Sequence, residues 1–243
     1  MMPSKTKLFF YRGMKNFFVK YQLHRIVEPL SGPLLDILYL SKISKWVKEH
    51  RNVEFNDFYS STWDYQKRYG LYEYVVKREK LDGPLTYLEF GVSGGDSFRW
   101  WVSNNRNPKS KFYGFDTFTG LPEDWGGFNA GAMSTDSQVP RLNDKRVKFI
   151  KGLFQETLPH FVKTTRMQGR KVIHLDADLY SSTLYVLTTI APLLGPGDIL
   201  FFDEFTVPRH EFLAFSNFVQ SYYLKFELLG AANNYFFVAF KLI

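Results

Sequence analysis

Short apolar segments alternate with helical segments over residues 85–243, and this alternation limits the folds open to the chain. Each apolar segment is rich in aromatic and branched residues and has the length of a strand. Parallel strands need a crossover helix between them, so strands separated by helices form a sheet that is covered on both faces. We therefore predict an α/β, doubly wound, mostly parallel seven-stranded sheet with an antiparallel edge. The predicted strands cover residues 85–90, 111–116, 146–152, 171–176, 198–203, 224–230 and 235–243.

The first 82 residues lack this alternation, and we interpret them as a basic helical N-terminal extension. Helical periodicity predicts three helices there, with a break between the first two at Ser31-Gly32-Pro33. The sequence Asp82-Gly83-Pro84 then marks a turn, which gives an extension at residues 1–82 and a main domain at residues 83–243. The predicted helices cover residues 5–24, 33–50 and 63–80.

The excess positive charge of the chain lies in its N-terminal part. Residues 1–51 hold 10 Lys and Arg against 3 Asp and Glu, whereas residues 52–243 hold 21 of each kind. The helix at 5–24 combines basic residues with Phe, Met and Tyr, which fits either a partner subunit or an anionic membrane surface. We expect a homo-oligomer or peripheral membrane attachment. Nucleic acid is not an expected partner, because no nucleic-acid-binding motif accompanies the charge.

The sequence also limits the compartment and the chemistry. It contains no cysteine, which excludes disulfides, thiolate metal sites and cysteine nucleophiles. Its apolar runs are shorter than the roughly 18 residues that cross a bilayer. The apolar stretch near the start ends at Arg12 and is too short for a signal peptide. We therefore expect a cytoplasmic protein that is at most peripheral to a membrane.

A glycine or a carboxylate follows the end of each of the first five predicted strands. In open α/β sheets, ligands bind beyond the carboxyl ends of the strands, so these residues should share one site. The first end is a glycine-rich turn, which lets a ligand approach the backbone closely. The second is Asp116, placed where a carboxylate would bind both hydroxyls of a ribose. The residues at the five ends are Glu89 with Gly91, Ser93 and Gly95; Asp116; Gly152; Asp176 and Asp178; and Asp203 with Glu204.

Four strings of residues, in this order and spacing, resemble the class I S-adenosylmethionine-dependent methyltransferases. They are most similar to the branch of the macrocin and mycinamicin sugar O-methyltransferases, and the resemblance covers roughly residues 60–243. It implies a bound S-adenosyl-L-methionine, with the helix at 63–80 as a lid whose Trp63, Tyr65, Tyr69 and Tyr72 line an acceptor pocket. The strings are YLEFGVSGGDS, GFDTFTGLPEDW, HLDADLYSST and LGPGDILFFDEF. The expected cofactor-binding residues are Glu89, Gly91, Ser93, Gly95, Asp116, Thr117, Phe154 and Asp176.

The same resemblance implies a divalent metal, usually magnesium, held by Asp176, Asp203 and Glu204. Neighbouring strand ends lie about 5 Å apart, so carboxylates from the fourth and fifth strands can converge on one hard cation. The relatives more often have Asp-Asp where this chain has Asp203 and Glu204. A bound cation could lower the pKa of an acceptor hydroxyl and orient it.

The group that removes the acceptor proton is open between two alternatives. One is the metal site, with Asp176 in the catalytic position, and the other is His210, which follows the acidic pair. The loop at 117–140 holds no histidine, although the sugar-methylating relatives place a histidine base there. Its glycine-rich part, residues 126–131, is expected to be a mobile lid.

The sequence therefore predicts an O-methyltransferase acting on a small hydroxylated acceptor, such as a sugar, a glycosylated metabolite or a phenol. One alternative is a nicotinamide-dependent dehydrogenase that uses the same glycine turn and Asp116. Against it, Ser93 stands where the G-x-G-x-x-G pattern needs its second glycine. The other alternative is a non-catalytic, membrane-associated protein that binds the cofactor without turnover.

Overall fold

The computed structural model describes residues 5–243, with side chains from residue 7 onward. The chain divides into two compact units, residues 1–42 and residues 43–243. We describe each unit by itself.

The N-terminal unit holds α1 (Lys5–Lys20) and the first part of α2 (His24–His50). The predicted break at Ser31-Gly32-Pro33 is wrong, because α2 continues through both Pro29 and Pro33. A proline removes one backbone hydrogen bond from a helix, and the flanking turns of α2 sustain the helix here. The Ser31 hydroxyl also donates to the Glu28 carbonyl oxygen at 2.7 Å. Over residues 5–243, no helix is both long enough and apolar enough to span a bilayer.

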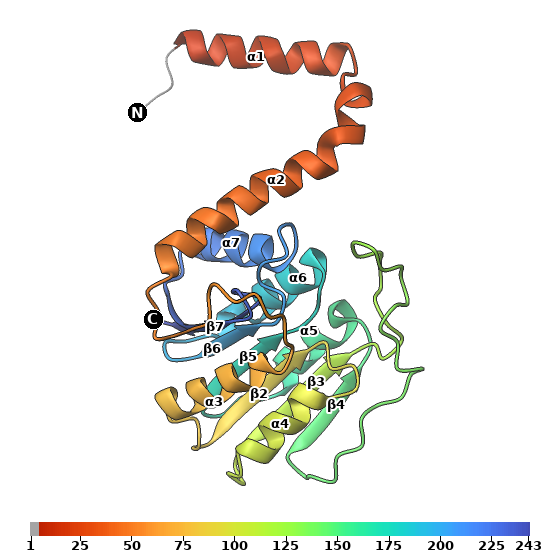
Figure 1. Cartoon of the computed structure of the whole chain (residues 1–243). Helices are drawn as coiled ribbons and strands as arrows, with labels where there is room; N and C mark the ends of the chain where they lie inside the picture. Colours follow the sequence, from red (N-terminus) through yellow and green to blue (C-terminus); the bar gives the residue numbers. More distant parts are fainter. Residues whose placement is uncertain (1–4) are drawn as a thin grey trace. The chain divides into compact units, whose positions relative to one another are not determined.

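The C-terminal unit is built on one eight-stranded sheet in the order β1-β7-β8-β6-β5-β2-β3-β4 (Figure 1). The seven predicted strands are all present, and the two-residue β1 adds an eighth at the edge beside β7. Strand β8 pairs antiparallel with both β6 and β7, whereas the remaining pairs are parallel. The strands are β1 (Phe55–Asn56), β2 (Leu85–Phe90), β3 (Lys111–Asp116), β4 (Val147–Lys151), β5 (Arg170–Leu175), β6 (Ile199–Phe202), β7 (Phe226–Ala232) and β8 (Phe237–Leu242).

Helices cover both faces of this sheet, as a doubly wound fold requires (Figure 1). The chain leaves β2 toward β3 and β4 on one side, while β5 and β6 lie on the other, so the strand order reverses between β2 and β5. Ligands bind at such a reversal, beyond the carboxyl ends of the strands. Helices α3 (Lys67–Glu79) and α4 (Asp96–Asn104) lie on one face, and α5 (Phe154–Thr164), α6 (Tyr180–Ile190) and α7 (Glu211–Tyr222) lie on the other.

The boundary between the compact units falls between Lys42 and Ile43, well before the boundary predicted at residues 82 and 83. The reason is the packing of α3, whose Leu71, Tyr72 and Val75 are fully buried in the core of the sheet unit. This helix begins at Lys67 rather than at residue 63, so Trp63 and Tyr65 precede it. Residues of α3 thus complete the core of the sheet unit, although they precede residue 83.

Trp101 of α4 lies at the centre of this aromatic core. Its ring stacks on Tyr87 at a centroid distance of 5.1 Å and contacts Tyr72 and Phe201 at 5.6 and 5.3 Å. The α3 and α4 helices and two strands therefore meet on this one side chain.

We expect Trp101→Ala to lower the free energy of unfolding by about 3–5 kcal/mol, because it leaves a large cavity among rings. Trp63→Ala is the matched control: Trp63 is 53% exposed where Trp101 is 0% exposed. The control should cost less than about 1 kcal/mol. Urea unfolding followed by circular dichroism measures both, and equal losses would contradict this account of the core.

Candidate active site

A cavity of about 370 Å³ opens at the carboxyl ends of β2, β3 and β5. Its size is within the range of pockets that hold a small molecule or a cofactor. Eight of the residues predicted for the site line it, namely Gly91, Ser93, Gly95, Asp116, Thr117, Phe154, Asp176 and Glu204. The other three, Glu89, Asp203 and His210, are not among the lining residues.

The glycine turn after β2 is fixed by a close approach between two backbone segments. Gly91 has a φ of +91°, and a Cβ built on it would lie 1.8 Å from the carbonyl oxygen of Asp176. Only glycine fits such a contact in this backbone conformation. The turn is therefore held against the end of β5, which brings the cofactor-binding segment and the acidic segment together.

Asp116 shapes the same turn from the end of β3. Its Oδ2 accepts hydrogen bonds from the backbone amides of Val92 and Ser93, both at 2.7 Å. Its Oδ1 accepts one from the amide of Phe118, also at 2.7 Å. A carboxylate has about four acceptor positions, so one position on Oδ1 is left for a ligand. The binding of ribose hydroxyls by Asp116 stays a prediction.

Glu89 lies beneath the cavity and is fully buried. Its carboxylate accepts hydrogen bonds from the Tyr87 hydroxyl and, at 2.7 Å, from the hydroxyl of Ser97. Ser97 belongs to the first turn of α4 and lines the cavity. Within this structure Glu89 therefore positions the α4 end of the site.

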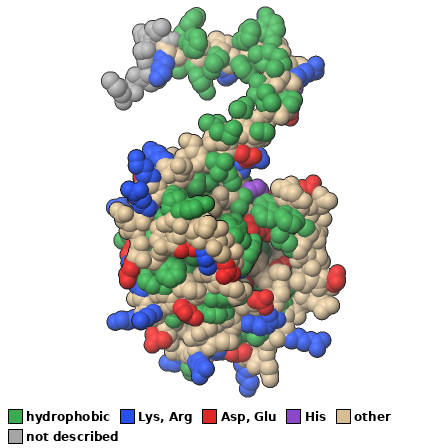
Figure 2. All heavy atoms as spheres, viewed as in Figure 1, with side chains coloured by type: hydrophobic (Ala, Val, Ile, Leu, Met, Phe, Trp, Pro, Cys, Tyr) green, Lys and Arg blue, Asp and Glu red, His purple; other side chains and the backbone are tan. Residues whose placement is uncertain are grey.

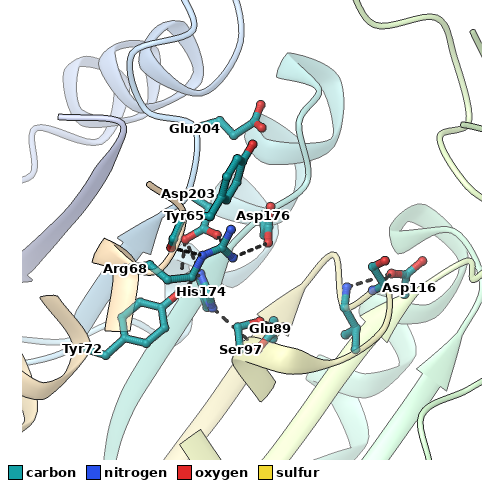
Figure 3. Close-up of polar contacts among 12 residues, drawn as sticks. Tyr65, Arg68, Tyr72, Glu89, Ser97, Asp116, His174, Asp176, Asp203 and Glu204 are labelled. Atoms are coloured by element: carbon teal, nitrogen blue, oxygen red, sulfur yellow. Dashed lines mark hydrogen bonds and ion pairs between the residues drawn. The ribbon is translucent and has the colours of Figure 1, made fainter. Parts of the chain in front are cut away.

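Asp203 is the centre of a buried polar network. Its Oδ1 accepts hydrogen bonds from His174 Nε2 at 2.9 Å and from the Tyr72 hydroxyl at 3.3 Å. Its Oδ2 forms an ion pair with the guanidinium of Arg68 at 2.5 Å. The same guanidinium nitrogen lies 3.8 Å from Asp176 Oδ2, so Arg68 joins the two carboxylates (Figure 3).

The network favours the charged forms of His174 and Asp203. Burial alone would lower the pKa of His174, but Asp203 and Glu89 overcome burial and raise it to about 10. Burial opposes the charge of Asp203 too, yet His174 and Arg68 hold the pKa of Asp203 below its usual value. Burial and the charge of Asp203 raise the pKa of Asp176 well above its usual range. A charged His174 has no free lone pair on its ring.

Glu204 belongs to a second acidic group. Burial, followed by the charges of Asp178 and Asp203, raises the pKa of Glu204 to about 9. Burial raises the pKa of Asp178 to about 6, and a hydrogen bond joins the Asp178 and Glu204 side chains. The backbone amide of Glu204 donates to Glu211 at 2.9 Å. Glu204 is thus bonded to Asp178 and does not point with Asp203 at a shared cation.

The residues around Asp203 do not fit the magnesium site that the sequence predicts. Ligand atoms of His174, Asp176 and Asp203 lie within 4.8 Å of one another, which is close enough for a metal. However, the Arg68 guanidinium already contacts both carboxylates, at 2.5 Å from Asp203 and 3.8 Å from Asp176, and the Glu204 side chain is bonded to Asp178. A hard cation needs several oxygen ligands, and the two carboxylates of this cluster already share a guanidinium. Magnesium binding stays a prediction from the sequence.

Other predicted side chains lie away from the cavity. His210 precedes α7, and its ring lies 6.1 Å from that of Trp125 in the loop after β3. Of the four aromatic residues expected to line an acceptor pocket, only Tyr65 does so. The others pack on neighbouring rings: Trp63 on Phe236, Tyr69 on Trp100 and Tyr72 on Trp101. From the loop after β3, the lining residues are Thr117, Gly120, Leu121, Pro122 and Met133, and none comes from 126–131.

Arg68 is the functional side chain that sequence reasoning missed. It lines the cavity, and it is separated from Asp176 and Asp203 by more than a hundred residues of sequence. A signal for it was present, because Tyr65, Arg68 and Tyr72 follow the i, i+3, i+7 spacing of one helical face. A cation on an aromatic face that packs on the sheet needs a carboxylate partner.

Comparison with known proteins agrees with this geometry. Residues 88–205 match a family described as a methyltransferase domain. A rhamnosyl-tetracenomycin 4′-O-methyltransferase from Streptomyces olivaceus is 29% identical over 58% of this chain and 61% of its own length. The mycinamicin III 3″-O-methyltransferase of Micromonospora griseorubida is 34% identical over 28% of this chain and 25% of its own length. The chain thus spans less than two thirds of these curated relatives.

Solved structures share the fold. A calicheamicin methyltransferase, CalS11, superposes with a TM-score of 0.56 at 22% identity, over 73% of this chain and 78% of that chain. The O-methyltransferase NovP superposes with a TM-score of 0.54 at 21% identity over the same shares. The fold is that of the Rossmann-like methyltransferases. The resemblance found in the sequence is confirmed by the match of residues 88–205 to a methyltransferase domain.

Gly91→Ala tests the contact that joins the glycine turn to β5. Its methyl group would collide with the Asp176 carbonyl oxygen, so we expect a loss of about 1–3 kcal/mol of stability or more. Gly94→Ala in the same turn is the control, because nothing lies within 4 Å of a Cβ there. It should change stability by less than about 0.5 kcal/mol. Thermal unfolding distinguishes the two, and a neutral Gly91→Ala would show that the turn does not depend on this contact.

Proposed function

We propose that the chain is an S-adenosyl-L-methionine-dependent O-methyltransferase that acts on a small hydroxylated acceptor. The observation that carries the proposal is the joining of the glycine turn, Asp116 and Asp176 around one cavity within a methyltransferase domain. Both curated relatives are named as O-methyltransferases, and the name of the Streptomyces olivaceus relative gives a rhamnosyl-bearing compound as its acceptor. A sugar or a glycosylated metabolite is therefore the acceptor class that we favour.

The residues of the first two strand ends fit this cofactor. The turn at Gly91–Gly95 and the first turn of α4 line the cavity with backbone amides, which suit a carboxylate. The free acceptor position of Asp116 suits one hydroxyl of a ribose. Phe154, at the start of α5, gives the cavity an apolar wall for an adenine ring. These contacts support S-adenosyl-L-methionine as the cofactor of this cavity.

The acceptor proton is the one part of the chemistry that the protein must handle itself. When bound, S-adenosyl-L-methionine supplies a methyl group that its sulfonium already activates. Asp176 lines the cavity, and the ionised form of its carboxylate can accept a proton. We propose that Asp176 accepts the hydroxyl proton while the cavity walls hold the acceptor oxygen in line. His210 remains the alternative base. If Asp176 is the base, Asp176→Asn should abolish methyl transfer and His210→Ala should not; if His210 is the base, the reverse should hold.

A nicotinamide dehydrogenase and a non-catalytic binding protein are the competing functions. A thermal shift with S-adenosylmethionine, S-adenosylhomocysteine and NAD separates the cofactors. Transfer of a labelled methyl group to nucleoside-diphosphate sugars and glycosylated polyketides then tests turnover. Stabilisation by NAD alone would overturn the proposal.

Asp116→Ala should weaken S-adenosylhomocysteine binding at least tenfold, since it removes a ligand contact and the acceptor of three backbone amides. Asp82→Ala, in an exposed turn far from the site, is the control and should bind normally. Isothermal titration calorimetry measures both. Unchanged affinity in Asp116→Ala would contradict the placement of the ribose.

We also propose that the N-terminal helices attach the enzyme to an anionic membrane surface. The side chains of Phe9, Phe10, Phe17 and Phe18 on α1 are exposed, and hydrophobic side chains gather along both helices (Figure 2). The excess of basic residues in this segment complements an anionic surface. A second copy would bring a second basic helix, so like charges disfavour pairing through α1.

Deletion of residues 1–30 should abolish flotation with phosphatidylserine vesicles and leave S-adenosylhomocysteine binding intact. Vesicles of phosphatidylcholine are the control, because they lack the anionic charge. Light scattering on both proteins tests the alternative. A loss of oligomers without any vesicle binding would show that α1 contacts a second copy.

A further inference from the structure

Arg68, a residue of α3, contacts two of the carboxylates that were predicted to bind magnesium. Its guanidinium contacts Asp203 at 2.5 Å and Asp176 at 3.8 Å, and these are two of the three predicted metal ligands. Both oxygens of Asp203 are thereby occupied, one by Arg68 and one by His174 and Tyr72. The two carboxylates therefore already share one fixed cation, the guanidinium of Arg68.

The guanidinium is held in place by two aromatic rings. It lies 5.1 Å from the ring centroid of Tyr65 and 5.0 Å from that of Phe237. A guanidinium is planar and weakly hydrated, so it stacks on rings while its N–H groups bind carboxylates. Tyr65 also lines the cavity, so this arrangement lies on the wall that faces a ligand. Arg68 is thus built into the site and is not a surface side chain that folds inward by chance.

We propose that Arg68 is the resident cation of this site and takes the role of the divalent metal. The inference rests on the proposed methyltransferase function, and it predicts methyl transfer that needs no metal ion. An acceptor hydroxyl beside Asp176 also lies beside the guanidinium, because both groups line the same wall of the cavity. As the proton moves to Asp176, negative charge develops on the acceptor oxygen. A fixed positive charge next to that oxygen stabilises the transition state in the way that a bound cation would.

The geometry gives this proposal a readout that does not depend on turnover. Without Arg68, Asp176 and Asp203 would lose the guanidinium that they share, and such a pair of carboxylates attracts Mn²⁺. The wild-type protein should leave the electron paramagnetic resonance signal of Mn²⁺ at the level of free ion. Arg68→Gln should bind about one Mn²⁺ per chain, and the double variant Arg68→Gln with Asp203→Asn should lose it.

Turnover supplies the second readout. Wild-type methyl transfer should be unchanged by excess EDTA, whereas Arg68→Gln should fall about a hundredfold or more and recover in part with Mn²⁺ or Mg²⁺. A purely structural role for Arg68 would not make a variant responsive to metal. Arg68→Lys keeps the charge but loses the paired N–H geometry, so it should be intermediate and insensitive to metal.

Each outcome decides whether Arg68 or a divalent metal ion is the cation of this site. Mn²⁺ binding by the wild-type protein that is lost in Asp203→Asn, or wild-type transfer that EDTA abolishes, would overturn the proposal. An Arg68→Gln protein that folds by circular dichroism but binds no Mn²⁺ would overturn it as well. If Arg68→Gln does not fold, the wild-type titration and Arg68→Lys still decide. Calorimetry with S-adenosylhomocysteine tests the proposed function separately. If S-adenosylhomocysteine does not bind, the proposed function fails; if it binds and the metal results disagree, only the role of Arg68 fails.

Discussion

The site is organised by the need to satisfy one buried carboxylate, that of Asp203. An ionised group that is almost fully buried is costly unless cations and hydrogen bonds surround it. His174 from β5 and Arg68 from α3 supply the charges, and Tyr72 adds a hydroxyl. Asp203 therefore links the end of β6 to β5 and to α3, a helix that lies more than a hundred residues earlier in the sequence.

A second constraint couples this acidic network to the cofactor side of the cavity. Gly91 touches the backbone of Asp176, and Asp116 holds the amides of the turn that begins at Gly91. Glu89 continues the connection beneath the floor, since it contacts both His174 and Ser97. A change on either side of the cavity is thus felt on the other through backbone and buried side chains. This coupling suits a reaction in which a methyl donor and an acceptor must be aligned.

The sequence predicted well what depends on local pattern and topology. Strand periodicity was enough to predict the sheet, and the residues at strand ends, among them Gly91, Asp116 and Asp176, predicted part of the cavity wall. The sequence predicted poorly the side-chain contacts that depend on packing between distant segments. The partners of Glu204 and the position of Arg68 beside Asp203 depend on how α7 and α3 pack on the sheet. The helical spacing around Arg68 indicates its face of the helix but not the carboxylates that it contacts. The continuous α2 shows likewise that Ser31-Gly32-Pro33 alone does not end a helix.

The most direct test of this account is a crystal structure of the full chain grown with S-adenosylhomocysteine and manganese chloride, with anomalous diffraction recorded for manganese. We predict that the cofactor product lies in the cavity with a ribose hydroxyl on Asp116. We also predict that the Arg68 guanidinium lies between Asp176 and Asp203 with no anomalous peak there. A cavity without S-adenosylhomocysteine, or a manganese ion bound by the two carboxylates with Arg68 turned away, would contradict the account.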